Sequence, residues 1–124
     1  MKAYLQLKLE KSPKEKNNLF KNEIISSLEN DKAIDIKIID LKMKTFFADM
    51  LIIASGNSRR HITSMAEHIK DKLNKKKLKV NIEGLNKSEW ILIDCDTVIV
   101  HIFLPESRNY YNLEKIWSFN IKNK

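Results

Sequence analysis

Residues 48–62, which read ADMLIIASGNSRRHI, constrain the fold of this chain more than any other stretch. They begin with an apolar run at 50–54, short enough for one buried β-strand, and continue through Gly56. Ser58 follows, and serine is a favoured helix N-cap. The helix that it should open carries apolar residues at helical spacing, namely Ile62, Met65, Ala66, Ile69 and Leu73. A strand that turns through glycine into a helix is where α/β proteins often place ligands.

Two interpretations of the turn Ser55-Gly56-Asn57-Ser58 are open. Its backbone amides could cradle a phosphate, although the lysine and the glycine spacing of the known phosphate-binding loops are missing. Alternatively, the turn is structural, because Gly56 permits a positive φ and Ser58 caps the helix. We favour the structural interpretation.

The N-terminal half of the chain shows two further patterns. Ser12-Pro13-Lys14-Glu15 is a capping box with proline at the first helical position. It predicts a helix to about residue 30 that buries Leu19, Phe20, Ile24, Ile25 and Leu28. Residues 34–41 read as a strand, and their link to 50–54 is too short for a parallel crossover. We therefore expect these two strands to be antiparallel neighbours.

The C-terminal half predicts three strands and a helix. Residues 78–82 alternate as a strand, so a right-handed parallel crossover from 50–54 is allowed. The apolar runs 90–93 and 98–104 flank Asp94-Cys95-Asp96-Thr97, which is a hairpin signal. A helix starting at Glu106 or Ser107 would place Tyr110, Leu113 and Trp117 on one face. The order of these expected helices and strands predicts an α/β (α+β) domain, with a mixed sheet of about five strands flanked by helices.

Charge is distributed unevenly along the chain. The formal net charge is +7, and lysines gather at residues 70–79, which makes an RNA-binding module an alternative function. Residues 83–110 reverse the sign through Glu83, Glu89, Asp94, Asp96 and Glu106. This acidic region predicts a basic partner. No apolar run is long enough for a membrane span, and the single cysteine excludes an internal disulfide.

No convincing catalytic or metal-binding set is evident. Asp94 and Asp96 form a pair that could hold a divalent metal, but acids are common in hairpin turns and no third ligand can be named. Cys95 lacks an evident histidine partner, and His101 is expected to be a hydrogen-bonded core or rim residue. Trp90 and Tyr111 are either core aromatics or interface anchors. We expect a binding protein with no catalytic residues, no metal and no cofactor.

A set of short motifs occurs in one order between residues 12 and 118. The motifs are Asp35-Ile36 with Asp40, Ala48-Asp49, Ala54-Ser55-Gly56-Asn57-Ser58-Arg59, Glu83-Gly84, Trp90-Ile91-Leu92-Ile93-Asp94, Val98-Ile99-Val100-His101-Ile102-Phe103 and Arg108-Asn109-Tyr110-Tyr111-Asn112-Leu113-Glu114-Lys115-Ile116-Trp117. Together they resemble the ribosomal silencing factors, also called RsfS or Iojap-like proteins. The last two motifs are the most specific. The usual Gly-Asp turn of the family is replaced by Cys95-Asp96-Thr97, and this chain is basic where the family is often acidic.

The resemblance implies a nucleotidyltransferase-like fold that is not known to catalyse. It implies that the protein binds universal large-subunit protein fourteen, on the intersubunit face of the large ribosomal subunit. Bound there, it would block subunit joining and repress translation when nutrients run short, and it would form a homodimer when free. A nucleotidyltransferase enzyme is the less favoured alternative, because the metal-binding acids expected after the turn are missing.

The resemblance also gives expected boundaries and contacts. Residues 12–118 would form one domain, with an N-terminal extension at 1–11 and a tail at 119–124. The residues expected at the partner interface are Glu83, Trp90, Asp94, His101, Arg108, Tyr110, Tyr111 and Glu114. A peripheral contact between residues 70–79 and ribosomal RNA is compatible with this role. The absence of an Arg- and Ser-rich leader predicts the bacterial cytoplasm.

Overall fold

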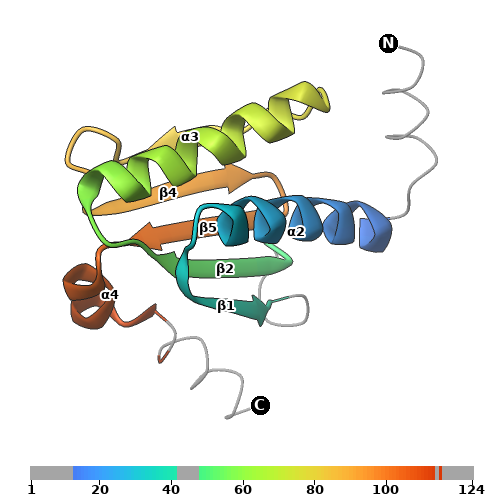
Figure 1. The fold of residues 1–124 in the computed structure, drawn as a ribbon. Helices are drawn as coiled ribbons and strands as arrows, with labels where there is room; N and C mark the ends of the chain where they lie inside the picture. The colour runs from blue at the N-terminus through green and yellow to red at the C-terminus, as the bar shows by residue number, and fades with distance from the viewer. Residues whose placement is uncertain (1–12, 42–47, 114, 116–124) are drawn as a thin grey trace.

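A computed structural model of the protein describes residues 13–41, 48–113 and 115 (Figure 1). The chain forms one five-stranded sheet with helices packed on it, which confirms the predicted mixed α+β architecture. The elements in chain order are α2 (Pro13–Asn30), β1 (Ile34–Asp40), β2 (Met50–Ser55), α3 (Arg59–Lys75), β3 (Asn81–Glu83), β4 (Trp90–Cys95), β5 (Val98–Phe103) and α4 (Pro105–Tyr111). Ser12 of the capping box, the link 42–47 and Trp117 lie outside the described residues.

The strand order is β1-β2-β5-β4-β3. β2 pairs with β5 in parallel, whereas the other three pairs are antiparallel. The predicted antiparallel pair β1–β2 and the predicted β4–β5 hairpin are both confirmed. β3 runs parallel to β2 but is not its neighbour, because β5 and β4 lie between them. β3 is also shorter than the predicted strand at 78–82, because its pairing with β4 begins only at Asn81. The backbone before it is irregular, since Lys77 has a positive φ of 65°.

Both α2 and α3 cover the same face of the sheet (Figure 1). Their apolar stripes meet alternate residues of the central strands, such as Val100 of β5 and Ile93 of β4. The α2 stripe is narrower than predicted: Phe20, Ile24 and Leu28 are buried, whereas Leu19 and Ile25 are half-buried. The α3 stripe is buried as predicted. This cluster is the main core, and the other residues of the same strands point to the opposite face.

The opposite face carries a smaller apolar cluster and, among the described residues, no long helix (Figure 1). Leu51 and Ile53 of β2 and Phe103 of β5 are buried there, with Trp90 and Ile99 packed beside them. The two clusters account for the β2 burial pattern, because β2 is apolar on both sides as a central strand must be.

The C-terminal helix differs from the prediction. α4 ends at Tyr111, because Asn112 adopts a left-handed conformation with a φ of 50° and its N–H bonds to the carbonyl of Arg108. Asparagine is one of the few residues that enter this conformation readily. Leu113 therefore lies beyond the helix, and Tyr110 is not on a core-facing stripe but 82% exposed. The predicted shared face of Tyr110 and Leu113 was wrong.

The turn after β2 is structural, but not for the predicted reason. Gly84 is the glycine with a positive φ, whereas Gly56 lies outside that region. A Cβ on Gly56 would stand 2.5 Å from Cγ2 of Ile62, so the glycine allows α3 to approach the end of β2. Ser58 caps α3 as predicted, and its Oγ accepts a hydrogen bond of 3.0 Å from the N–H of His61.

We predict that Gly56→Ala lowers the free energy of unfolding by about 1–3 kcal/mol, because Ile62 is fully buried and cannot move away freely. Urea denaturation measures the change. The matched control is Asn57→Ala at the next, exposed position, which should change stability by less than about 0.5 kcal/mol. Equal stability of the two variants would contradict the close-approach role of Gly56.

Candidate functional site

The face of the sheet opposite α2 and α3 gathers four of the eight predicted interface residues. Asp94 and Trp90 alternate on β4, and the register places them beside β3 and β5 on one face. His101 lies opposite Leu92, which in turn lies opposite Glu83. Glu83 and Asp94 are exposed, Trp90 is half-buried and His101 is buried. We call this surface the open face, and define it by these four residues.

An aromatic cluster closes one end of the open face. The ring of Trp90 lies 5.1 Å from that of Phe103 and 4.4 Å from that of Tyr111, measured between centroids. Tyr110 meets Tyr111 edge-on at 5.0 Å, yet Tyr110 itself is exposed. Beside this cluster lies a hollow of about 410 Å³, lined by Gly84, Asn86, Lys87, Glu89, Trp90 and Tyr111. The hollow is large enough for one side chain of a partner protein.

His101 is locked in its neutral form. Trp90 Nε1 donates a hydrogen bond of 2.8 Å to His101 Nδ1, so this nitrogen must be unprotonated. Burial lowers the pKa of His101 from 6.5 to about 4. The hydrogen bond acts in the same direction, because it is accepted only by the neutral ring. The expected hydrogen-bonded histidine is confirmed, and its role is to orient Trp90.

We predict that His101 makes the protein less stable as the pH falls. The unfolded chain takes up a proton near pH 6.5 and the folded chain only near pH 4, so stability is lost between these values. From pH 7 to pH 5 the loss attributable to His101 is about 2 kcal/mol. Urea denaturation at the two pH values should show a smaller loss in His101→Gln, whose amide oxygen still accepts from Trp90. An identical pH dependence in both proteins would disprove this assignment.

Arg108 is buried and holds α4 against the sheet. Its Nη1 donates to Ser55 Oγ at 2.9 Å and to the carbonyl of Ile34 at 3.4 Å, while Nη2 lies 3.4 Å from the carboxylate of Asp35. Asp35 has a φ of 51° where the register of β1 shifts, and this irregularity brings β1 to the guanidinium. With 7% of its surface exposed, Arg108 positions α4 and Tyr111 rather than offering itself to a partner.

We predict that Arg108→Leu lowers the free energy of unfolding by about 3 kcal/mol, because it removes charged hydrogen bonds from a buried position. Ser55→Ala removes one of these bonds and leaves the guanidinium in place, so it should cost about 1 kcal/mol. Thermal unfolding followed by circular dichroism would measure both. Native-like stability of Arg108→Leu would contradict the role as a tether.

The remaining candidates have structural explanations. Asp94 Oδ1 accepts a hydrogen bond of 3.1 Å from the N–H of Asp96, as expected of a hairpin turn. Cys95 is buried, and its burial together with the charge of Asp94 raises the pKa of the thiol to about 12, so it stays protonated. Within the described part of the chain, no three His, Cys, Asp or Glu side chains gather to hold a metal. Glu114 lies outside the described residues.

Two amides of the Gly56 turn, those of Gly56 and Asn57, are already hydrogen-bonded. The N–H of Asn57 donates a hydrogen bond of 2.9 Å to Nδ1 of His61. The N–H of Gly56 donates one of 3.0 Å to the carbonyl of Phe103. The N–H of His61 is bonded to Ser58. A phosphate bound by these amides would have to displace their bonds, which favours a structural role for the turn.

One polar network was missed by sequence reasoning. Asn17 of α2 is buried. Its Nδ2 donates a hydrogen bond of 2.7 Å to the carboxylate of Asp49, and its Oδ1 accepts a hydrogen bond from the hydroxyl of Thr97. The carbonyl of Thr97 also accepts from the N–H of Asp49 at 2.7 Å. The network joins α2, the start of β2 and the β4–β5 turn. Nothing local marks Asn17, which looks like a surface residue of a helix.

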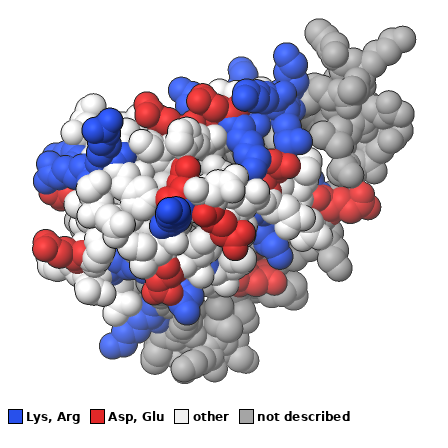
Figure 2. All heavy atoms as spheres, in the orientation of Figure 1, with Lys and Arg blue, Asp and Glu red and all other residues white. Residues whose placement is uncertain are grey.

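Lys and Arg atoms form groups on the side of the molecule that Figure 2 shows, and Asp and Glu atoms are present there as well. Blue atoms cluster near the start of α3 beside the β3–β4 loop, and again around the end of α3, in the orientation of Figure 1. The second cluster includes Lys72 and Lys75, in the last turn of α3. Glu83 and Asp94 of the open face carry the opposite sign. None of the described helices is long and apolar enough to cross a membrane.

Comparison with known proteins assigns the family. A family model described as "Ribosomal silencing factor during starvation" (RsfS) matches residues 13–124. The chain is 39% identical over 114 residues to the ribosomal silencing factor RsfS of Zymomonas mobilis, covering 87% of this chain and 86% of that protein. It is 31% identical over 99 residues to the mouse protein named "Mitochondrial assembly of ribosomal large subunit protein 1", covering 77% of this chain and 43% of that protein.

The fold agrees with this assignment. A crystal structure of a Chromobacterium violaceum protein superimposes with a TM-score of 0.79 at 31% identity, covering 82% of this chain and 85% of that one. The protein described here belongs to the ribosomal silencing factor family.

Proposed function

We propose that the protein docks its open face on universal large-subunit protein fourteen, at the intersubunit face of the large ribosomal subunit, and thereby prevents the small subunit from joining. The observation that carries the proposal is the alternation of Glu83, Trp90, Asp94 and His101 onto the one face of the sheet that α2 and α3 do not cover. The mouse relative is named for the large ribosomal subunit, which supports the choice of subunit. Repression of translation then needs only steric overlap with the incoming subunit.

The open face has the chemistry of a docking surface for a basic protein. Trp90 and Tyr111 provide rigid aromatic area beside a hollow, and such residues dominate the binding energy of interfaces. Glu83 and Asp94 are exposed on the same face, and charges at the rim of an interface steer association and set orientation. Tyr110, at 82% exposed, extends the aromatic surface outward. His101 and Arg108 contribute by positioning, because each is buried and holds an aromatic residue in place.

The same proposal includes the remaining expectations from the sequence. The protein forms a homodimer when free and works in the bacterial cytoplasm without a catalytic step or a cofactor. Residues 12–118 are the functional domain, with 1–11 as an extension and 119–124 as a tail, and Glu114 belongs to the interface.

A general RNA-binding role for residues 70–79 has weaker support. Lys72 and Lys76 lie 3.6 and 3.5 Å from the carboxylate of Glu23, so part of their charge is used to join α3 to α2. Asp71 lies among the same lysines. A peripheral contact with ribosomal RNA at this end of α3 remains compatible with docking through the open face.

We predict that the protein sediments with isolated large ribosomal subunits and that Asp94→Asn weakens this binding about fivefold. Asparagine keeps the hydrogen bond to Asp96 and removes only the charge, so the fold is preserved. Tyr111→Ala should weaken binding about tenfold or more, because it removes an aromatic anchor. Sedimentation through a sucrose cushion, with increasing amounts of protein, gives the affinities.

The matched control is Asp71→Asn, which makes the same charge change on the exposed side of α3. Its affinity should equal that of the unmodified protein. Failure of the unmodified protein to sediment with large subunits would refute the proposal. Equal weakening by Asp71→Asn and Asp94→Asn would refute the assignment of the open face, since it would indicate a general charge effect.

A further inference from the structure

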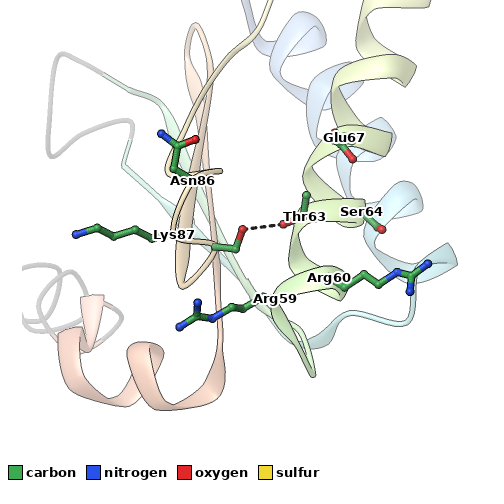
Figure 3. A pocket seen from close by; sticks show the side chains of 8 residues that line it. Arg59, Arg60, Thr63, Ser64, Glu67, Asn86 and Lys87 are labelled. Atoms are coloured by element: carbon green, nitrogen blue, oxygen red, sulfur yellow. Dashed lines mark hydrogen bonds between the residues drawn. The ribbon is translucent and has the colours of Figure 1, made fainter.

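A second hollow lies on the other side of the β3–β4 loop, away from the open face. It has a volume of about 410 Å³ and is lined by Arg59, Arg60, Thr63, Ser64, Glu67, Asn86, Lys87 and Ser88. The first five come from the first three turns of α3, and the last three from the loop before β4 (Figure 3). We call it the α3 groove.

The α3 groove has a hydrogen-bonded floor and an exposed, positively charged rim. The hydroxyls of Thr63 and Ser88 share a hydrogen bond of 2.9 Å across the groove, marked by the dashed line in Figure 3. Ser88 Oγ also donates a hydrogen bond of 2.7 Å to the carbonyl of Leu85. These bonds tie the loop to α3. Lys87 extends from the loop side and Arg60 from the far side of α3, so the cations stand apart rather than meeting at one point (Figure 3).

Two of the three rim cations are available to a ligand. Arg59 is paired with Glu89 at 2.9 Å, on an exposed part of the surface. Arg60 and Lys87 are exposed, and within the described residues neither has an ion-pair partner. Glu67 is the one acid among the lining residues. The groove is therefore net positive.

We propose that the α3 groove binds the phosphate backbone of RNA. A single small anion is best held by cations that converge on it, whereas separated cations around an open groove suit a chain of phosphates. The positive side of α3 continues past the groove, because Lys70 follows Thr63 and Glu67 at helical spacing and is exposed. Arg59 and Lys70 are about 16 Å apart along the helix axis, which spans two or three successive phosphates of an RNA strand.

This contact is separate from docking through the open face. The loop residues Asn86 and Lys87 line both hollows, so the loop stands between the two surfaces. A protein partner would lie on one side of it and an RNA strand on the other. The inference does not depend on the proposed protein partner, since it rests only on the geometry and charge of the groove.

The test is the binding of a fluorescein-labelled RNA hairpin to the full chain, followed by fluorescence anisotropy over a series of KCl concentrations. Arg60→Gln and Lys87→Gln should each weaken binding about fivefold at low salt and reduce the slope of log affinity against log salt by about one. Glu67→Gln should strengthen binding about twofold, because it removes the one acid of the groove. All three positions are exposed, so folding is unaffected.

Lys37→Gln on β1 is the matched control, since it removes one positive charge from an exposed position on the edge strand far from the groove. It should leave the affinity for the hairpin unchanged, and so should Asp94→Asn on the open face. No binding of the hairpin, or equal weakening by Lys37→Gln and Arg60→Gln, would overturn the proposal. A strong preference for one hairpin sequence over a scrambled one would also overturn it, because backbone contacts carry no sequence information. Loss of subunit binding in Asp94→Asn with unchanged RNA binding separates this proposal from the proposed function.

Discussion

The parallel pairing of β2 with β5 is the constraint on which the rest of the structure depends. Among the described strands it is the one parallel contact, and it joins strands that are separated by α3, β3 and β4 in the chain. Two antiparallel pieces are attached to it, β1 on one side and the β4–β3 pair on the other. Because both central strands are buried on both faces, the sheet needs apolar cover on each side.

That requirement divides the molecule into two different sides. α2 and α3 supply the cover on one face, and the charged residues of α3 are carried outward with it. On the other face the apolar contacts come from single aromatic side chains. Trp90 and Phe103 are residues of the strands themselves, and Tyr111 is the last residue of α4. Aromatic residues therefore remain near the surface there, between exposed acids. The contrast explains how one small domain can offer an acidic, aromatic surface and a basic one at the same time.

Positioning of the open face relies on buried polar groups rather than on apolar packing alone. The hydrogen bond from Trp90 to His101 fixes the indole, and Arg108 fixes the helix that carries Tyr111. Each of these groups is costly to bury and would destabilise the fold if its partner were lost. A directional bond sets the orientation of a ring, which apolar contact by itself does not.

Local periodicity was enough to predict most of the elements, and the family resemblance singled out Glu83, Trp90, Asp94 and His101, which the strand register then brings to one face. The helix cap at Ser58 and the hairpin at Asp96 were also predictable, because both depend on neighbouring residues. Leu113 was misplaced because the left-handed Asn112 ends α4, and Gly56 was misread because its neighbour Ile62 is set by packing.

The tertiary structure alone decided which of these residues are available to a partner. Arg108 is buried because an irregularity in β1, far away in the chain, brings Asp35 and the carbonyl of Ile34 to it. The α3 groove exists because a helix and a distant loop are joined through Thr63 and Ser88. The sequence by itself determined the elements and their alternating faces, since these follow from short-range spacing. Exposure, pairing and the shape of the two hollows depend on strand order, which is a long-range property of the fold.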